Sequence, residues 1–375
     1  MTKAAELAKM GEVITNSQIG RKNIIINGAM QVAQRGTSET GVGNTSGYFT
    51  VDRFKYEKDG TIAGRVTLTQ SAVTDLNGFS NALKIDCTTA DTDVAANEGI
   101  MIQYHVEGLS CQQLKSSSTS TNAFTLSFYA KSNASRAIAS EIRFAEGTNL
   151  HASKLHTIGT SWARYTMTIP AASSTEVDND NTAAFQINLF LHAGSNTSSG
   201  TIAGTTLTSL TQANRAAGIG SIVASTDNTL EITGVQLEVG SQATPFEHRS
   251  YGEERQLCYR YYYRTPDSVA GGQAANEAFP CVGNMDGSQT GAFMFLFPVP
   301  MRAAPTAIEQ SGTAGDYSIR VTSDANGTSV PSASGFTSEK ALVNLVSSGA
   351  GFTGGDGAFM RMEDTDAFIA FSAEL

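Results

Sequence analysis

Acidic residues at alternate positions in two polar stretches are the side chains of this sequence best suited to hold a metal ion. Glu176, Asp178 and Asp180 alternate in EVDNDN, and Asp91 and Asp93 alternate in DTDV. Hard cations such as Ca²⁺ take several carboxylate and carbonyl oxygens, which alternating loop residues can supply. Neither run has the EF-hand pattern, which needs a glycine at the sixth position and a distant Glu. We expect solvated loops here, so Asp91, Asp93, Asp178 and Asp180 are weak calcium candidates, and we expect no cofactor.

The spacing of the remaining reactive residues does not predict a catalytic centre. The five histidines form no HExxH pattern, and the gap of five between His151 and His156 puts them on different faces of a helix or strand. No G-x-S-x-G motif is present. A polysaccharide depolymerase needs two carboxylates about 5–10 Å apart, and the sequence singles out no such pair. We therefore expect a protein that is not an enzyme.

Aromatic residues supply the candidate binding surfaces. Trp162, the single tryptophan, begins the stretch WARYTMTI and is a candidate for stacking on a sugar ring. Its alternation with Tyr165 and Met167 favours packing at the edge of a core instead. A second cluster, whose rings suit a domain or subunit interface at least as well as a glycan, comprises Tyr259, Tyr261, Tyr262 and Tyr263.

Short alternating apolar segments must position these side chains. Segments with the period of a half-buried strand recur along the chain and are separated by turn-rich stretches, which predicts an all-β antiparallel sandwich of the jelly-roll type. They are residues 23–27, 30–35, 52–57, 65–69, 82–86, 100–106, 123–130, 139–144, 162–169, 184–192 and 229–239. Four polar stretches are predicted to be loops, and the last is long enough to contact a partner: 37–47, 116–122, 173–182 and 194–228.

Two helices are predicted outside the sandwich. Ser250 and Glu253 form a possible capping box, which predicts a connecting helix before the linker-like run 265–277. Ala4, Leu7, Ala8 and Ile14 have helical spacing and predict a short N-terminal helix that packs on its own domain, or on a partner or copies of itself. The predicted organisation is an attachment arm at 1–22, a sandwich at 23–248, helix and linker at 249–277 and a smaller C-terminal β domain at 278–375.

Composition limits the partners. The net charge of -10 disfavours nucleic acid, because phosphate binding needs clustered Lys and Arg. No run of about 18 apolar residues is present, so we expect no membrane insertion. Four widely spaced cysteines lack zinc spacing and are expected to be buried thiols. The C-terminal domain has few charges and an apolar stretch at Phe293–Met301, which indicates that another subunit covers part of its surface.

Three stretches carry a resemblance to a known family. NIIINGAMQVAQRGTS (Asn23–Ser38), LEVGSQATPFEHRSYGEERQLCYRYYYR (Leu237–Arg264) and FPVPMRAAPTAI (Phe297–Ile308) resemble tailed-bacteriophage virion structural proteins, among them tail fibre and minor structural proteins with a carbohydrate-binding-module-like β-sandwich. The resemblance covers most of residues 20–308.

The resemblance implies a homo-oligomer, most simply a trimer, that is assembled in the host cytoplasm and located in the virion. It implies a tail fibre or host-attachment component, joined to other virion proteins through its N-terminal segment and binding a host surface glycan. A capsid decoration protein (cement or head fibre) that stabilises the shell is one alternative. A polysaccharide-degrading tailspike enzyme is the other.

Overall fold

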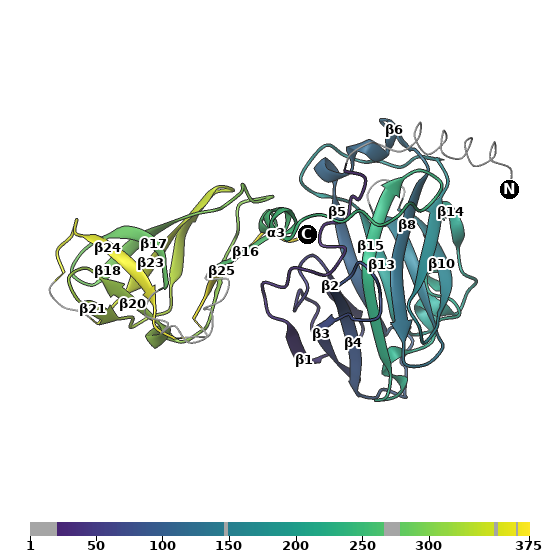
Figure 1. Ribbon diagram of the computed structural model, residues 1–375, viewed down its shortest axis with the longest axis horizontal. Coiled ribbons are helices and arrows are strands. Elements are labelled where there is room, and N and C mark those ends of the chain that lie inside the picture. Colours follow the sequence, from purple (N-terminus) through teal and green to yellow (C-terminus); the bar gives the residue numbers. More distant parts are fainter. Residues whose placement is uncertain (1–20, 146–148, 266–277, 349–351, 365–366) are drawn as a thin grey trace. The chain divides into compact units, whose positions relative to one another are not determined.

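The structure is a computed structural model that describes residues 21–145, 149–265, 278–348, 352–364 and 367–375 (Figure 1). The chain divides into an N-terminal unit of residues 1–254 with Leu375, and a C-terminal unit of residues 255–374. This division falls inside the segment 249–277 that was expected to connect two domains. The predicted N-terminal helix, with Ala4, Leu7, Ala8 and Ile14, lies outside the described residues.

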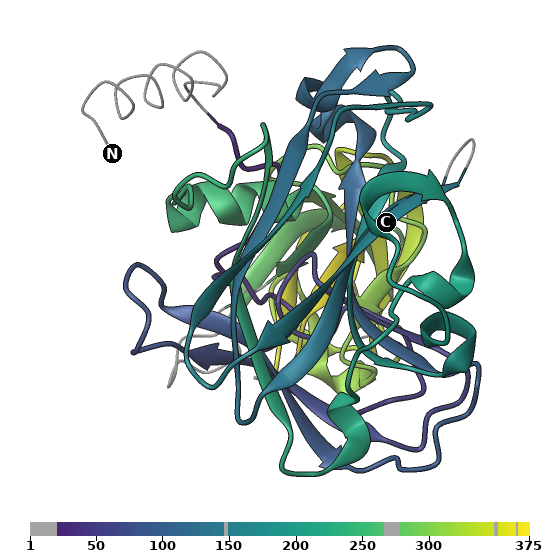
Figure 2. The same ribbon diagram turned by 90° about the vertical axis from the view of Figure 1, so that its right-hand side faces the viewer.

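Two six-stranded antiparallel sheets form the N-terminal unit (Figures 1 and 2). The first sheet has the order β1 (Ser38–Val42), β3 (Arg65–Ala72), β4 (Asn81–Thr89), β15 (Thr229–Val239), β8 (Phe124–Ser132) and β11 (Ala163–Ile169). The second has the order β14 (Gly204–Ser209), β10 (Leu150–Ile158), β9 (Arg136–Phe144), β13 (Ala183–Ala193), β5 (Gly99–Glu107) and β2 (Lys55–Asp59). The N-terminal unit also contains a small sheet of β12 (Ala172–Ser173), β7 (Ser120–Thr121) and β6 (Lys115–Ser117). These sheets confirm the predicted β-sandwich.

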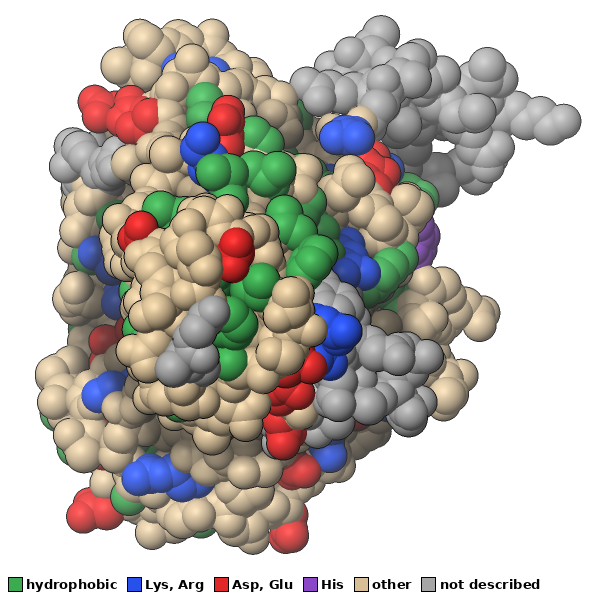
Figure 3. Space-filling view, turned by 90° about the vertical axis from the view of Figure 1, so that its left-hand side faces the viewer, with side chains coloured by type: hydrophobic (Ala, Val, Ile, Leu, Met, Phe, Trp, Pro, Cys, Tyr) green, Lys and Arg blue, Asp and Glu red, His purple; other side chains and the backbone are tan. Residues whose placement is uncertain are grey.

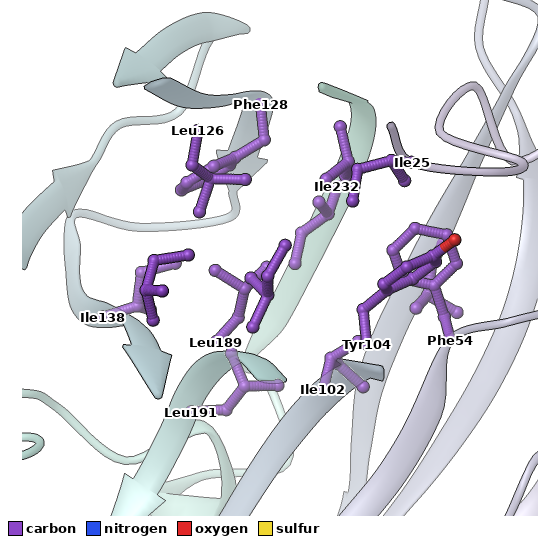
Figure 4. Packing of buried hydrophobic residues seen from close by; sticks show 14 of the residues in the cluster. Ile25, Phe54, Ile102, Tyr104, Leu126, Phe128, Ile138, Leu189, Leu191 and Ile232 are labelled. Carbon is purple, nitrogen blue, oxygen red and sulfur yellow. The ribbon is translucent and has the colours of Figure 1, made fainter. Parts of the chain in front are cut away.

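The core between the two sheets follows from the period of two along each strand. On β8, Phe124, Leu126 and Phe128 are fully buried, and on β13 Leu189 and Leu191 face them from the second sheet. Figure 4 shows Leu126 and Phe128 of the first sheet, and Leu189 and Leu191 of the second, pointing into the space between the sheets. Burying each large apolar side chain contributes about 1.5–3 kcal/mol, so the apolar positions of these strands decide which face of each sheet turns inward.

The segment Asn23–Arg35 was predicted to form two strands, and this prediction is wrong. The segment is buried but irregular, because side chains rather than a neighbouring strand satisfy much of its backbone. Asn27, at a φ of 61°, accepts the amide of Val32 and donates to its carbonyl, and the Tyr104 hydroxyl accepts the amide of Ile26. Alternation in the sequence reports burial here, not strand pairing.

The stretch 194–228 was predicted to be a loop, and this prediction is wrong in part. It contains α2 (Ser195–Ser198), β14 and the short 3₁₀ turns η3 (Gln212–Asn214) and η4 (Ile222–Ala224). Its Ala216 is fully buried against Phe190 and Met101 on the outer face of the second sheet. Several apolar residues of the stretch fall between positions 216 and 224, among them the fully buried Ile222 and Val223, and they show no strand or helix period.

The connecting helix and the smaller β domain are both confirmed. Helix α3 (Tyr251–Tyr259) follows Ser250, whose hydroxyl accepts the amide of Glu253 at 3.3 Å. The C-terminal unit has a three-stranded sheet of β16 (Tyr262–Thr265), β25 (Ile369–Ser372) and β19 (Ile308–Gln310). Its seven-stranded sheet has the order β21 (Asp324–Asn326), β20 (Tyr317–Arg320), β24 (Gly357–Met362), β17 (Ala278–Met285), β18 (Thr290–Leu296), β23 (Lys340–Val346) and β22 (Ser332–Phe336). Further 3₁₀ turns are η1 (Gly108–Ser110) and η2 (Gln112–Leu114) in the N-terminal unit and η6 (Ala314–Asp316) in the C-terminal unit.

Within the described ranges, no helix combines the length and the apolar character needed to cross a membrane.

Candidate functional site

An aromatic cluster lies on the outer face of the first sheet of the N-terminal unit. It consists of Phe79, Tyr129, Trp162, Phe246 and His248. Ring centroids lie 5.3 Å apart for Phe79 and Tyr129, 5.0 Å for Phe79 and Phe246, and 4.9 Å for Phe246 and His248. Phe79 is buried, His248 is exposed and the other three are half-buried. The cluster therefore presents ring surface to solvent on a rigid sheet.

Both strands and loops position these rings. Tyr129 is on β8, between the core residues Phe128 and Ala130, so the pleat directs it to the outer face. On the neighbouring strand β15, Gly234 has a φ of 60°, and a Cβ at this position would lie 2.8 Å from the rings of Phe79 and Tyr129. The positive φ and the close contact with the two rings both require a glycine here, because any side chain would displace the cluster.

Polar groups border the indole of Trp162. The indole Nε1 donates to the Asp75 carboxylate at 2.8 Å, and the Lys131 ammonium donates to the same carboxylate at 2.9 Å. The Lys131 ammonium also lies 5.0 Å from the centroid of the indole ring, within the range of a cation–π contact. Hydrogen bonds from Lys131 and then from Trp162 lower the pKa of the exposed Asp75 carboxyl, so this acceptor is ionised at neutral pH.

This arrangement has the chemical features of a sugar-binding surface. Sugar rings stack their C–H faces on flat aromatic surfaces, and their hydroxyls bond to charged side chains at the rim. Asp75 supplies a carboxylate acceptor and Lys131 a flexible donor that can move off the ring to bond a hydroxyl. Trp162 is half-buried and packs against the core of this cluster, as its alternation in the sequence favoured. Its stacking on a sugar ring stays a prediction.

The tyrosines of the second aromatic candidate lie within the C-terminal unit. Tyr261 and Tyr262 are 1% exposed, and Tyr259 is buried. The Tyr262 hydroxyl donates to Glu309 at 2.9 Å, and the ring of Tyr263 stacks on Phe371 with 6.5 Å between centroids. These rings fill the unit itself and expose little surface.

The weak calcium candidates bond to the chain around them. The buried Asp91 accepts the amides of Ala63 and Gly64 through Oδ2 and the amide of Asp93 through Oδ1. Asp180 accepts the amide and hydroxyl of Thr182, which lowers the pKa of its carboxyl. Asp178 is exposed, and its backbone carbonyl accepts from the Gln112 side chain at 2.8 Å. Across the described part of the chain, no group of three or more His, Cys, Asp or Glu could hold a metal ion.

A buried carboxylate on the outer face of the second sheet is held by four donors. Glu141 accepts Nε and Nη2 of Arg215 at 2.9 and 2.7 Å, His151 Nδ1 lies 3.1 Å away, and Asn188 donates at 2.8 Å. Burial alone raises the pKa of the Glu141 carboxyl, but the bonds to His151 and Arg215 outweigh it and lower the pKa to about 2. A carboxyl group with so low a pKa is ionised near neutral pH and has no proton to donate.

Among the described residues, two serine–histidine pairs have hydrogen-bond geometry. Nδ1 of the buried His192 lies 2.8 Å from Oγ of the half-buried Ser221, and its Nε2 lies 3.3 Å from the buried Glu98 carboxylate. The other pair faces the core. Ser140 Oγ lies 2.8 Å from Nε2 of His156, and Ser140 is fully buried while His156 is 5% exposed. Burial, followed by the charge of Lys154, lowers the pKa of His156 to about 4. His151 is on the opposite face of β10, as the odd spacing of the two histidines indicates. Because no substrate reaches Ser140, we interpret the pair as part of the core.

Sequence reasoning found one residue of the aromatic cluster and missed its neighbours. Tyr129 and Lys131 alternate with the core residues of β8, so their outward direction was readable from the sequence. Asp75 lies in the turn between β3 and β4, and Phe246 follows β15, so only the fold brings these two beside Trp162.

Comparisons with known proteins assign the chain to no family. No protein-family profile matches the chain, and no curated protein matches it by sequence. The solved structures that resemble it include the enzymatically active domain of bacteriophage CBA120 tailspike protein 4 (14% identity, 58% of this chain, 21% of that one, TM-score 0.30). The family 11 carbohydrate-binding module of Clostridium thermocellum has 12% identity over 56% of this chain and 99% of its own, with a TM-score of 0.28.

A third structure is the N-terminal cellulose-binding domain of Cellulomonas fimi β-1,4-glucanase C (10% identity, 50% of this chain, 90% of that one, TM-score 0.25). At identities and TM-scores this low, these structures carry no conclusion about this chain, and no site residue is carried over from them.

Proposed function

We propose that this chain is a bacteriophage virion protein that adheres to the host surface by binding a glycan through the aromatic cluster around Trp162. The observation that carries the glycan site is the half-buried indole beside the ion pair of the ionised Asp75 and Lys131, on the outer face of a sheet. The virion and tail-fibre assignment is supported by the resemblance of the three sequence stretches.

The proposed action is binding without catalysis. Three buried groups resemble catalytic ones: Glu141, the Ser140–His156 pair, and His192 between Ser221 and Glu98. Glu141 and the Ser140–His156 pair are held by their neighbours in forms that suit packing, and His192 is fully buried. The proposed location is the virion surface.

Isothermal titration calorimetry of the purified full-length chain with host envelope polysaccharide tests the glycan site. We expect binding to weaken roughly tenfold or more in Trp162→Ala, because loss of a central aromatic anchor costs more than about 1.4 kcal/mol. Tyr251→Ala is the matched control, because Tyr251 is 52% exposed and lies outside the cluster. Equal binding by wild type and Trp162→Ala, with Tyr251→Ala unchanged, would show that the site is elsewhere.

Two further measurements test the rest of the proposal. Release of oligosaccharides from the same polysaccharide would contradict binding without catalysis. Immunogold labelling of purified particles separates a tail fibre from a capsid decoration protein, because label confined to capsid faces excludes the fibre.

A further inference from the structure

One face of the seven-stranded sheet in the C-terminal unit is apolar and open to solvent. Phe293, Phe295 and Met360 point to the other face and are buried in the core. The large apolar side chains of the open face are Val282, Met294, Leu296, Leu342, Val346 and Phe359, with exposed fractions of 62%, 48%, 69%, 39%, 36% and 44%. In Figure 3, hydrophobic side chains gather in a band on the face that is drawn, with acidic and basic side chains beside it.

Strand register aligns these side chains in a straight row across the sheet. Phe359 on β24 is opposite Val282 on β17, Val282 is opposite Met294 on β18, and Met294 is opposite Leu342 on β23. The row continues to Arg320 on β20 at one end and to Gly335 on β22 at the other. Four central strands therefore present one apolar side chain each, at the same level.

The chemistry of this row excludes a glycan and fits a protein. None of the four central side chains carries a donor or acceptor for a sugar hydroxyl. Asn284, Ala292 and Asn344 form the adjacent row on one side. On the other side lie Lys340, at the start of β23, and Arg361 of β24, which is 6% exposed and pairs with Asp324. An apolar centre with a polar rim is the anatomy of a protein–protein interface.

We propose that this face binds the same face of a second copy of the chain. Seven strands about 4.8 Å apart and about six residues long cover roughly 30 by 20 Å, which approaches the roughly 800 Å² that each partner buries in a standard interface. Two sheets of this kind pack face to face at about 10 Å, as in a β-sandwich. A patch this apolar is unusual on a surface that stays in water.

The row is complementary to itself when the two copies are related by a two-fold axis parallel to the strands between β17 and β18. That axis places Val282 of one copy over Met294 of the other, and Phe359 over Leu342. Arg320 then lies over Gly335, which has open space around its Cα. The exposed Glu339, in the turn between β22 and β23, is near that end of the row and supplies a negative charge for Arg320.

The alternative axis, along the row, would place Arg320 over Arg320, and like charges disfavour it. The favoured interface is isologous and therefore forms dimers, whereas the family resemblance implies a trimer. It does not depend on the aromatic cluster, which belongs to the N-terminal unit, so we expect Trp162→Ala to leave it intact.

Light scattering on the purified full-length chain tests the proposal. We expect wild type to have about twice the 39.4 kDa of one chain, and Met294→Lys to fall to one chain mass while keeping its circular dichroism spectrum. Val94→Lys is the matched control, because Val94 is 43% exposed in the N-terminal unit. A monomeric wild type, or a dimer that Met294→Lys leaves unchanged, overturns the proposal.

Disulfide cross-linking decides the geometry even if Met294→Lys does not fold. The native cysteines 87, 111, 258 and 281 are buried and will not compete. Mixing the Val282→Cys and Met294→Cys variants should give mixed disulfide dimers in larger yield than either variant gives alone. Cross-linking no greater in the mixture than in the separate variants overturns the proposed pairing.

Discussion

Removing Arg215 should destabilise the N-terminal unit by about 3–5 kcal/mol, because it leaves the carboxylate of Glu141 buried without its counter-charge. Glu141 is 0% exposed and receives two of its four hydrogen bonds from Arg215. Arg215→Met keeps an apolar stem and removes the guanidinium, whose Cζ also lies 5.0 Å from the centroid of the Phe190 ring. The remaining partners, His151 and Asn188, cannot compensate fully, since His151 carries a charge only when it is protonated.

The test is urea unfolding followed by the fluorescence of Trp162. This is the single tryptophan of the chain and it lies in the N-terminal unit, so its signal reports that unit. The double variant Glu141→Gln with Arg215→Met removes both charges and keeps an amide for Asn188. We expect it to recover at least about 2 kcal/mol relative to Arg215→Met. A double variant as unstable as Arg215→Met would refute the reasoning, because the loss would then come from packing alone.

Two further predictions concern pH and backbone conformation. Burial, with a smaller effect of Lys154, lowers the pKa of His156 from 6.5 to about 4 in the folded state, so the unfolded chain binds more protons between these values. The free energy of unfolding should therefore fall by about 3 kcal/mol as the pH falls from 6.5 to 4, and the urea midpoint should fall with it. This dependence should flatten in His156→Asn. Protonation of Glu141 should lower the free energy of unfolding further below pH 4.5, towards its pKa of about 2. A urea midpoint that does not change between pH 7 and pH 4 contradicts the argument. Gly234→Ala should cost about 2–4 kcal/mol, because its φ is positive and its Cβ would strike two rings, whereas Gly252→Ala, with open space in helix α3, should be neutral or stabilising.

The sequence predicts the strands whose core-facing positions are large and apolar, and it misses those whose pattern is inverted. β13 is readable because Phe185, Ile187 and Leu189 all point inward. β10 is not, because Leu155 points to solvent and is 37% exposed, while His156 is buried on the core side. Local alternation cannot report a strand whose burial depends on partners far away in the chain.

The candidate site was predictable only where strand alternation fixes the direction of a side chain. Trp162 stands out as a single tryptophan beside a strand, but the ring surface around it depends on loop residues from both ends of the sandwich. Asp75 and Trp162 are 87 positions apart and meet because β4, β15, β8 and β11 lie in that order in one sheet. Such a meeting follows from topology, which alternation does not encode.

The stretches that carry the family resemblance largely have structural roles. Arg249, in the second stretch, bonds the Ile25 carbonyl of the first stretch at 3.0 Å and the Glu254 carboxylate at 2.7 Å, and Glu254 in turn accepts the amide of Asn27. In the C-terminal unit, Arg302 of the third stretch donates its amide to the Arg260 carbonyl at 2.7 Å. These residues hold irregular backbone in place, so they characterise the fold and do not indicate which ligand the chain binds. The ligand and partner must therefore be sought on surfaces such as the Trp162 cluster and the Val282 row, which lie mostly outside those stretches.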